Sequence, residues 1–183
     1  MHSEVRIRQL RGGDSAEVLK WVADPTFRGD FLWLSKVSMK EVIKEVRKLM
    51  VSRNPRLTGV EETQSNRLVG LVLCHRPRGF DYYEVGFYLE PSVRGRGYGP
   101  AALRLLVDRL LRRNRVETIM AGTSSLNARS QRALEKAGFS REGVWKSTLF
   151  RNGRWEDSVI FTLSRGERLA DVGRAKKSHV TTF

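Results

Sequence analysis

Between a strand-like run, VGFYLE, and an amphipathic helix, PAALRLLVDRLLRR, the chain carries a six-residue segment, RGRGYG, at Arg94–Gly99. Backbone N–H groups at the start of a helix have no intrahelical partner, and the helix dipole favours an anion there. Glycine lets such a backbone approach phosphates closely and take positive φ, while Arg94 and Arg96 add positive charge. Pro100 suits the first helical turn, where its missing N–H costs nothing. The junction therefore predicts a site for a pyrophosphate.

The spacing of this segment limits which phosphate compound it holds. It is not Gly-x-x-x-x-Gly-Lys-Ser/Thr, which argues against a nucleoside triphosphatase, and Gly95-x-Gly97-x-Gly99 is not the dinucleotide fingerprint. An Arg-Gly tract from an RNA-binding protein is an alternative. Here, however, a single patch lies between two ordered elements.

Composition indicates one globular domain. Of the 183 residues, 40% are hydrophobic and 30% are charged. A chain of this length and hydrophobic content can bury a substantial core. The N-terminus lacks an apolar segment and the run VGLVLC, Val69–Cys74, is too short to span a bilayer, so we expect a cytoplasmic protein without membrane contact. With Cys74 alone and three scattered histidines, we expect neither an internal disulfide nor a metal site.

The positive charge is the unusual part of the composition. Thirty-four Lys and Arg against twenty Asp and Glu give a net charge of +14 and a pI near 10.7. From Pro91 to Lys136 there are ten basic and three acidic residues, so half of the excess flanks the glycine segment. Such a distribution favours a polyanionic partner such as nucleic acid, the ribosome or a phosphorylated cofactor, although a solvated basic surface would look the same.

The first half of the chain predicts a strand, two helices and three further strands. Glu4–Leu10 alternates with period two, and a helix follows with Asp14 or Ser15 as N-cap. A second helix begins after Ser38, which is placed to form a capping box with Glu41. Three strand-like runs then predict an antiparallel meander: Arg56–Glu62, Arg67–Arg76 and Asp81–Glu90.

The second half predicts two helices and three strands. The helix after the glycine segment places Leu103, Leu106, Val107 and Leu110 inward, with Arg104, Asp108 and Arg112 outward. Next we expect a strand at 116–123, a helix from the N-cap Asn127 to Gly138, and a hairpin turning at Asn152-Gly153. Beyond this single domain, residues 1–164, a basic tail at 165–183 is predicted to be flexible.

Two segments resemble one family. RGRGYG fits the Arg/Gln-x-x-Gly-x-Gly/Ala signature of the GNAT superfamily of N-acetyltransferases, and NARSQRALEKAGF, Asn127–Phe139, is similar to its second segment. The motifs, their separation and the element order agree over residues 4–164. EVGFYL before the loop and N-x-x-S on the later helix resemble the branch of ribosomal-protein N-terminal and antibiotic acetyltransferases. The resemblance implies an α+β fold, with a mixed, largely antiparallel sheet, a splayed pair of middle strands and helices on both faces.

The resemblance also implies acetyl-CoA, or another acyl-CoA, as the acyl donor. The strand Val85–Leu89 is expected to splay from its neighbour after a bulge and to offer backbone groups to the pantetheine amides. The expected donor-binding residues are Phe87, Tyr88, Leu89, Arg94, Gly95, Arg96, Gly97, Tyr98, Gly99 and Asn127, with Ser130 also near the pantetheine arm.

The acceptor amine is expected from the opposite side, between loop 24–35 and hairpin 144–155. Glu84 matches a general base of relatives, although a strand glutamate facing solvent is the alternative. Many relatives place an acidic tyrosine where this chain has Leu134, which leaves Ser130, Tyr88 or water as the acid. The expected catalytic residues are Glu84 and Ser130.

Aromatic residues line the expected acceptor pocket or anchor its loops: Phe27, Phe31, Trp33 and Trp145.

Three functions follow as hypotheses. The first is direct acyl transfer from acyl-CoA to a primary amine, on a small molecule such as an antibiotic or on a protein N-terminus. The second is an RNA-linked acyltransferase, which uses aminoacyl-tRNA as donor to a small amine or acetylates a ribosomal protein N-terminus. For either function we expect a monomer or homodimer. The third is a non-catalytic CoA- or RNA-binding module. Five outer arginines are the expected RNA contacts: Arg104, Arg109, Arg112, Arg113 and Arg115.

Overall fold

A seven-stranded sheet forms the centre of the computed structural model, which describes residues 4–24, 38–54, 56–113, 116–151, 153–166 and 168. The strand order is β1-β2-β3-β4-β5-β7-β6, and among the described strands β4–β5 is the one parallel pair. The strands are β1 (Val5–Arg8), β2 (Arg56–Glu62), β3 (Leu68–His75), β4 (Tyr82–Leu89), β5 (Thr118–Ser124), β6 (Ser140–Arg151) and β7 (Arg154–Ser164). The predicted mixed, largely antiparallel sheet is confirmed, as is the meander β2-β3-β4.

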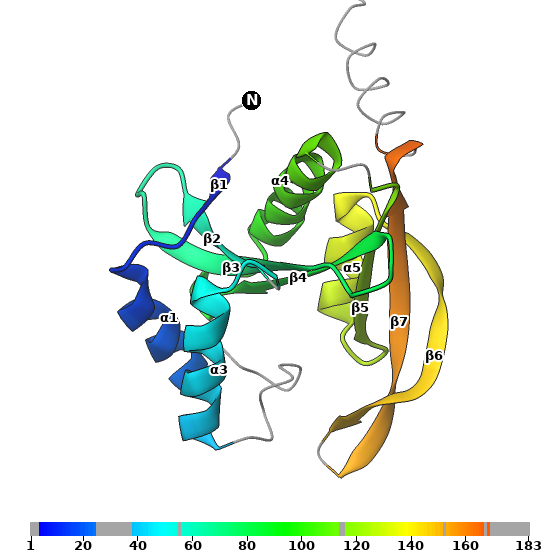
Figure 1. Cartoon of the computed structure of the whole chain (residues 1–183), viewed down its shortest axis with the longest axis horizontal. Coiled ribbons are helices and arrows are strands. Elements are labelled where there is room, and N and C mark those ends of the chain that lie inside the picture. The colour runs from blue at the N-terminus through cyan, green and yellow to red at the C-terminus, as the bar shows by residue number, and fades with distance from the viewer. Residues whose placement is uncertain are drawn as a thin grey trace, which may run out of the picture.

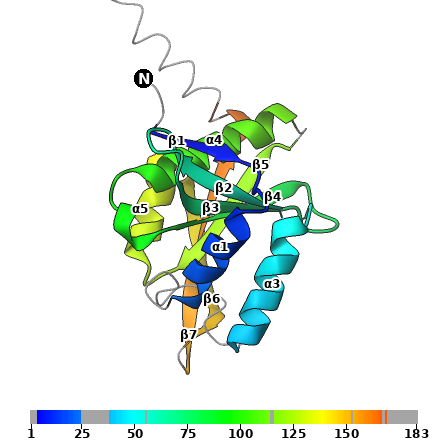
Figure 2. The same cartoon turned by 90° about the vertical axis from the view of Figure 1, so that its left-hand side faces the viewer.

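Helices cover both faces of this sheet (Figure 1). They are α1 (Asp14–Ala23), α3 (Met39–Val51), α4 (Tyr98–Arg113) and α5 (Ala128–Ala137), with a 3-10 turn, η2, at Pro91–Val93. One buried cluster joins α1 and α3 to β2 and β3, and a second joins α4 and α5 to the opposite face. Figure 2 shows the same layers from the side, with α1 and α3 below the sheet and α4 above it.

Local capping chemistry begins and ends the helices. Ser38 and Glu41 form the predicted capping box at the start of α3. Asn127 caps α5 by accepting the Ser130 N–H, and Gly138, at φ 98°, ends that helix in the left-handed region. The prediction for α1 was wrong: its N-cap is Gly13, which makes no side-chain capping bond.

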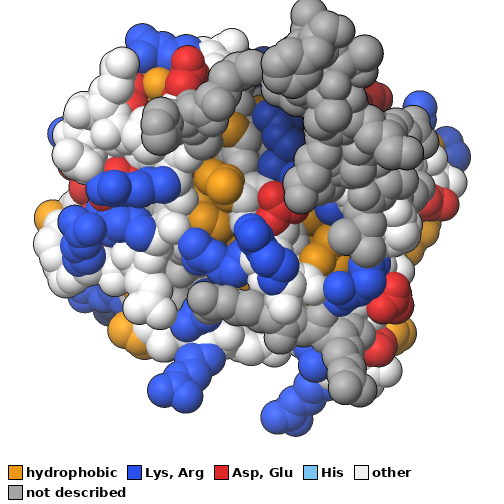
Figure 3. Space-filling view, turned by 90° about the horizontal axis from the view of Figure 1, so that it is seen from above, with side chains coloured by type: hydrophobic (Ala, Val, Ile, Leu, Met, Phe, Trp, Pro, Cys, Tyr) orange, Lys and Arg blue, Asp and Glu red, His pale blue; other side chains and the backbone are white. Residues whose placement is uncertain are grey.

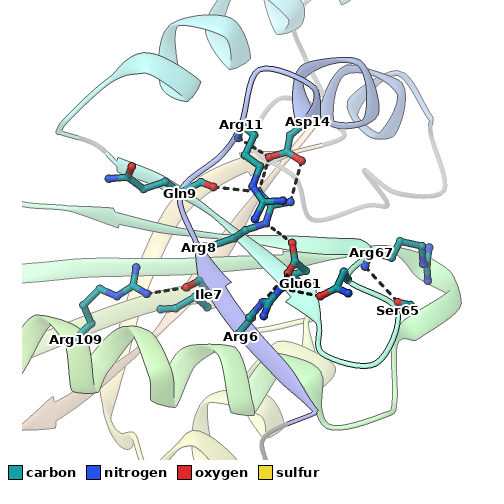
Figure 4. Close-up of polar contacts among 11 residues, drawn as sticks. Arg6, Ile7, Arg8, Gln9, Arg11, Asp14, Glu61, Ser65, Arg67 and Arg109 are labelled. Atoms are coloured by element: carbon teal, nitrogen blue, oxygen red, sulfur yellow. Dashed lines mark hydrogen bonds and ion pairs between the residues drawn. The ribbon is translucent and has the colours of Figure 1, made fainter.

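The Asp14 carboxylate is engaged elsewhere, in an ion-pair network that holds β1 against β2 and α1 (Figure 4). It accepts the Arg11 N–H at 2.6 Å and two bonds from the guanidinium of Arg8. Arg8 also pairs with Glu61, and Arg6 donates from Nε to the same carboxylate at 2.6 Å. Glu61 is fully buried, so this network compensates a carboxylate that has been removed from water.

The helix α4 buries its predicted stripe of Leu103, Leu106, Val107 and Leu110. The chain continues past β7 along the end of this helix. There Arg168 forms a two-bonded pair with Asp108, at 2.8 and 3.0 Å. The predicted flexible tail therefore has its first described residues in contact with the domain, and the boundary at 164 stays a prediction.

Within the described part of the chain, no helix has the length and apolar character needed to cross a membrane. The same residues contain no group of three or more His, Cys, Asp or Glu side chains arranged to hold a metal ion. Cys74 is a free, buried thiol.

Candidate active site

Two neighbouring strands part in the middle of the sheet. β4 and β5 are paired at Tyr82–Glu84 with Thr118–Met120, after which β4 continues beside β3 and β5 continues beside β7. The predicted splay is therefore present. The expected bulge is not, because the β3–β4 register runs without a shift from Glu84 to Leu89.

The backbone of β4 offers polar groups to this gap. The Glu90 N–H donates to Val69 O at 3.0 Å, so residue 90 and every second residue before it face β3. The backbone groups of Val85, Phe87 and Leu89 consequently face the gap. The backbone of Tyr88 faces β3 instead. Its carbonyl oxygen approaches Gly70 of β3 so closely that a Cβ added at Gly70 would lie 2.4 Å from it.

The glycine loop lies at the open end of the gap, where α4 begins. Gly95 and Gly97 have φ of 85° and 83°, in the left-handed region that side chains other than glycine rarely adopt. Gly97 O accepts the Ala101 N–H at 3.2 Å, which starts the helix and leaves the N–H groups of its first turn without intrahelical acceptors. Gly99 has a different reason to be glycine, because a Cβ there would lie 3.0 Å from the Phe87 ring.

The loop is bound to the turn between β2 and β3 through Glu62. Tyr98 is buried and its hydroxyl donates to Glu62 Oε1 at 2.6 Å, while Ser65 donates to the other oxygen at the same distance. Arg96 Nη1 lies 4.0 Å from Glu62 Oε1. The phenol of Tyr98 thus anchors the loop from behind, and no local sequence pattern predicted this role for Glu62.

Arg94 is half-buried beside the gap. Its Nε donates to Leu89 O at 3.1 Å, which directs the side chain along the end of β4. Burial and then the positive charge of Arg129 lower the pKa of Arg94, while Asp24 acts in the opposite direction. Arg129, in the first turn of α5, therefore adds positive potential to this region, a role that was not predicted from the sequence. The signal available in the sequence was an arginine in the first helical turn after the N-cap Asn127.

The start of α5 lies at the end of β5. Asn127 Oδ1 accepts the Ser130 N–H at 3.1 Å, and Gln131 Nε2 donates to Ser125 O at 2.9 Å. The carboxamide oxygen of Asn127 is thus occupied by its capping bond, and Ser130 is half-buried. Leu134 is buried in the core cluster, so the position where relatives carry a tyrosine is a packing position here.

Glu84 lies at the point where β4 and β5 part. It is the last β4 residue paired with β5, opposite Met120, and its side chain is about half exposed, at 49%. Its carboxylate lies 3.9 Å from Nδ1 of His75 on the neighbouring strand. A carboxylate here can accept a proton from a group that enters at the end of the gap.

Of the expected acceptor pocket, Trp145 is described and Phe27, Phe31 and Trp33 lie outside the described residues. Trp145 is 54% exposed on β6, opposite Ser158 of β7. Phe150 and Trp155 are also exposed on this hairpin and their rings contact at 5.1 Å between centroids.

A buried carboxylate on the same hairpin was missed by the sequence analysis. Glu156 accepts the Ser124 hydroxyl at 2.7 Å, and both side chains are buried. Ser124 is the last residue of β5, so the pair lies at the far end of the gap from Glu84. The available signal was the alternation of Glu156 with Ser158 and Ile160 along the second strand of the predicted hairpin, which places the three residues on one face.

Most of the expected RNA contacts make internal bonds. Arg104 donates to Lys136 O at 2.6 Å, Arg109 to Ile7 O at 2.8 Å and Arg112 to Asp108 O at 3.1 Å. The Arg113 side chain and Arg115 lie outside the described residues. Figure 3 shows Lys and Arg side chains spread over the face above the sheet, with acidic side chains between them. The RNA-contact hypothesis stays a prediction, to which these internal contacts add no support.

Comparison with known proteins adds a family and a fold. A family model described as an acetyltransferase (GNAT) domain matches residues 4–140. The chain is 34% identical over 107 residues to the "Probable N-acetyltransferase YjcK" of Bacillus subtilis, a match that covers 57% of this chain and 59% of the relative. It is 30% identical over 80 residues to the "[Ribosomal protein uS5]-alanine N-acetyltransferase" of Escherichia coli, which covers 44% of this chain and 41% of that protein. The chain thus spans less than two thirds of the length of these curated relatives.

A solved structure agrees in fold over almost the whole chain. The spermidine N-acetyltransferase from Vibrio cholerae, in complex with CoA and spermine, superimposes with a TM-score of 0.78 and 20% identity. The superposition covers 92% of this chain and 99% of that one. The α+β architecture with a parted pair of middle strands is therefore a known fold.

Proposed function

Because the chain belongs to the GNAT acetyltransferase family, we propose that it transfers an acetyl group from acetyl-CoA directly to a primary amine. One observation carries the proposal: the parting of β4 and β5 opens towards a helix N-terminus that is preceded by two left-handed glycines and two arginines. This arrangement suits a long ligand with an anionic end and an amide-containing arm.

The pyrophosphate of the donor fits the N-terminus of α4. Gly95 and Gly97 expose the backbone, the first-turn N–H groups supply donors, and Arg94 and Arg96 supply charge. Tyr98 acts differently from the other loop residues, because its side chain is buried against Glu62 and holds the loop in place. Arg129 adds positive charge from α5.

The pantetheine arm fits the gap between the strands. Its amides would pair with the backbone of Val85 and Phe87, because these residues direct their N–H and C=O groups away from β3. The Leu89 carbonyl already accepts from Arg94, and the Tyr88 backbone faces β3, so we assign these two residues smaller parts. Asn127 borders the arm from the start of α5.

The reaction needs a neutral amine next to the thioester. The amine nitrogen attacks the carbonyl carbon, the C–S bond breaks, and the amine loses one proton while the CoA thiolate gains one. Glu84, at the point where the strands part, is placed to accept the amine proton directly or through water. Ser130 or water would protonate the thiolate, since Leu134 has no proton to give. Positioning of the two reactants supplies most of the remaining acceleration.

The acceptor is an amine of one of two kinds. Relatives are named for acetylating the alanine of ribosomal protein uS5 and for acetylating spermidine, so either a protein N-terminus or a small polyamine agrees with the family. The amine would approach from the face of the sheet that carries α1 and α3, on the side of the β6–β7 hairpin (Figure 1).

A donor–acceptor assay tests the proposal. The purified chain is incubated with acetyl-CoA and a panel of amines and N-terminal peptides, free thiol is followed by absorbance, and products are identified by mass spectrometry. We expect thiol release that depends on the amine and a product that carries one added acetyl group. Failure to bind acetyl-CoA in calorimetry, together with no acetylated product, would overturn the proposal.

A further inference from the structure

The acceptor-side face of the sheet holds a buried carboxylate and an exposed indole on the same hairpin. Resting on the acetyl transfer proposed above, we infer that the acceptor carries a second cationic group, and that Glu156 and Trp145 bind it. The reacting amine would then lie at Glu84, with the second cation towards the hairpin.

The strand alternation places Glu84 and Glu156 on one face. Val159, Phe161 and Leu163 of β7 belong to the core cluster that contains α4, so Glu156 and Ser158 face the other way. On β4, the residues that pack in that cluster are Val85 and Leu89, and Glu84 has the opposite parity. The two glutamates therefore share the face that is opposite α4, on either side of the parting strands.

Glu156 is suited to bind a cation because of its burial. It is 8% exposed, and the Ser124 hydroxyl donates to it at 2.7 Å while accepting the Leu126 N–H at 3.1 Å. These bonds fix the carboxylate at the end of β5. A carboxylate shielded from water and salt attracts a nearby cation more strongly than a surface carboxylate does.

Trp145 supplies the second half of the site. It is paired with Ser158 across the β6–β7 ladder, and Ser158 is two residues from Glu156 on the same face. Leu149 is the β6 residue paired with Glu156, and the β6 register shifts between Trp145 and Leu149, so the indole lies one shifted register step from the carboxylate on the same face. The indole is 54% exposed, so it is not filling the core, and an exposed aromatic face beside a carboxylate is a favourable environment for an ammonium ion.

The competing explanation is that Glu156 only orders the turn between β5 and α5. The two explanations differ in what they predict for different acceptors. A turn-ordering residue affects every acceptor equally, whereas a cation-binding residue affects only acceptors that carry the second charge.

The test compares acceptors that differ in that charge alone. Acetylation of 1,4-diaminobutane is compared with that of n-butylamine, and that of an Ala-Arg peptide N-terminus with Ala-Gln, so that the two arms separate a polyamine from a basic protein N-terminus. We expect kcat/KM to be at least about tenfold higher for the dicationic member of one pair, which corresponds to one well-formed ion pair. Glu156→Gln should remove most of that ratio, because it lowers kcat/KM for the dicationic acceptor far more than for the monocationic one.

Two further variants complete the design. Trp145→Ala, at an exposed position, should lower the ratio about threefold without loss of thermal stability. Glu135→Gln, an exposed glutamate on the outside of α5, is the matched control and should change neither acceptor. If Glu156→Gln unfolds, Trp145→Ala still tests the site, and calorimetry of the two amines with CoA-loaded protein tests it without catalysis.

Equal kcat/KM for both members of both pairs would overturn the inference, and so would a proportional loss for both acceptors in Glu156→Gln. These results are distinct from failure of the proposed function, in which no amine or peptide is acetylated by the unaltered protein.

Discussion

The hydroxyl of Tyr98 donates a 2.6 Å hydrogen bond to the carboxylate of Glu62, and this bond joins the first residue of α4 to the end of β2. The bond lowers the pKa of Glu62, after a larger effect from Ser65, and raises the pKa of Tyr98. A loop residue expected at the phosphates thus has its side chain behind the loop. The position of the loop relative to the sheet depends on this contact.

Tyr98→Phe should loosen the glycine loop while keeping its backbone. Loss of this hydrogen bond to a charged group should lower the free energy of unfolding measurably. The Kd for acetyl-CoA should rise several-fold, with kcat nearly unchanged. Denaturant unfolding and calorimetry measure the two effects. Tyr82→Phe is the control, at a β4 residue whose ring contacts Phe80 at a tilt. Equal effects from both variants would contradict the anchoring role.

Gly97→Glu should abolish acetyl-CoA binding. The side chain would force a residue with φ of 83° into strain of about 1–2 kcal/mol and place a negative charge where the pyrophosphate is expected. We expect a Kd at least roughly 100-fold higher by calorimetry.

Gly79→Glu separates strain from charge. Gly79, in the turn before β4, has nearly the same φ, 81°, and open space around its Cβ position. This control should lose similar stability and keep its acetyl-CoA affinity. If both variants bind normally, the loop is not the donor site.

Glu84→Gln should lower kcat about 100-fold at neutral pH if Glu84 removes the amine proton. The loss should shrink as pH rises, because more of the acceptor amine is then already neutral. Rate profiles from pH 6 to 10 on one amine check this, with Glu135→Gln as the control. A loss that is constant across pH would make Glu84 a structural residue.

Glu61→Gln should destabilise the fold most at neutral pH. Burial alone would raise the pKa of Glu61, but its bonds to Arg8 and Arg6 more than offset this and lower the pKa. A carboxylate with a lowered folded-state pKa contributes stability above its unfolded pKa, near 4.5, and loses it as pH falls through the folded value.

At pH 7 we therefore expect the variant to be about 3 kcal/mol less stable, because two arginines lose a buried partner. The difference should narrow steadily below about pH 4.5. Urea unfolding of both proteins between pH 3 and 7 measures it. A difference that stays constant over this range would show that the ion pairs contribute little and that the loss comes from packing.

Local patterns in the sequence determined the elements and their ends. The capping box at Ser38 and Glu41, the Asn127 cap and the Gly138 stop were all predicted, because each depends on residues three or four positions apart. The glycine loop and the buried stripe of α4 were predicted for the same reason. The α1 cap failed because Asp14 is engaged by Arg8 from another element.

Contacts between distant segments decided what the sequence left open. Glu62 lies 36 residues from Tyr98 and Glu156 lies 32 residues from Ser124, so no local pattern could pair them. The partners of the outer arginines of α4 could not be predicted for the same reason. Helical periodicity alone places Arg109 on the solvent side of the helix, but in the structure its guanidinium donates to Ile7 O, 102 residues away. Side-chain chemistry over one turn of helix is set by the sequence, but the partner of a long polar side chain is set by which strands and helices the fold brings next to it.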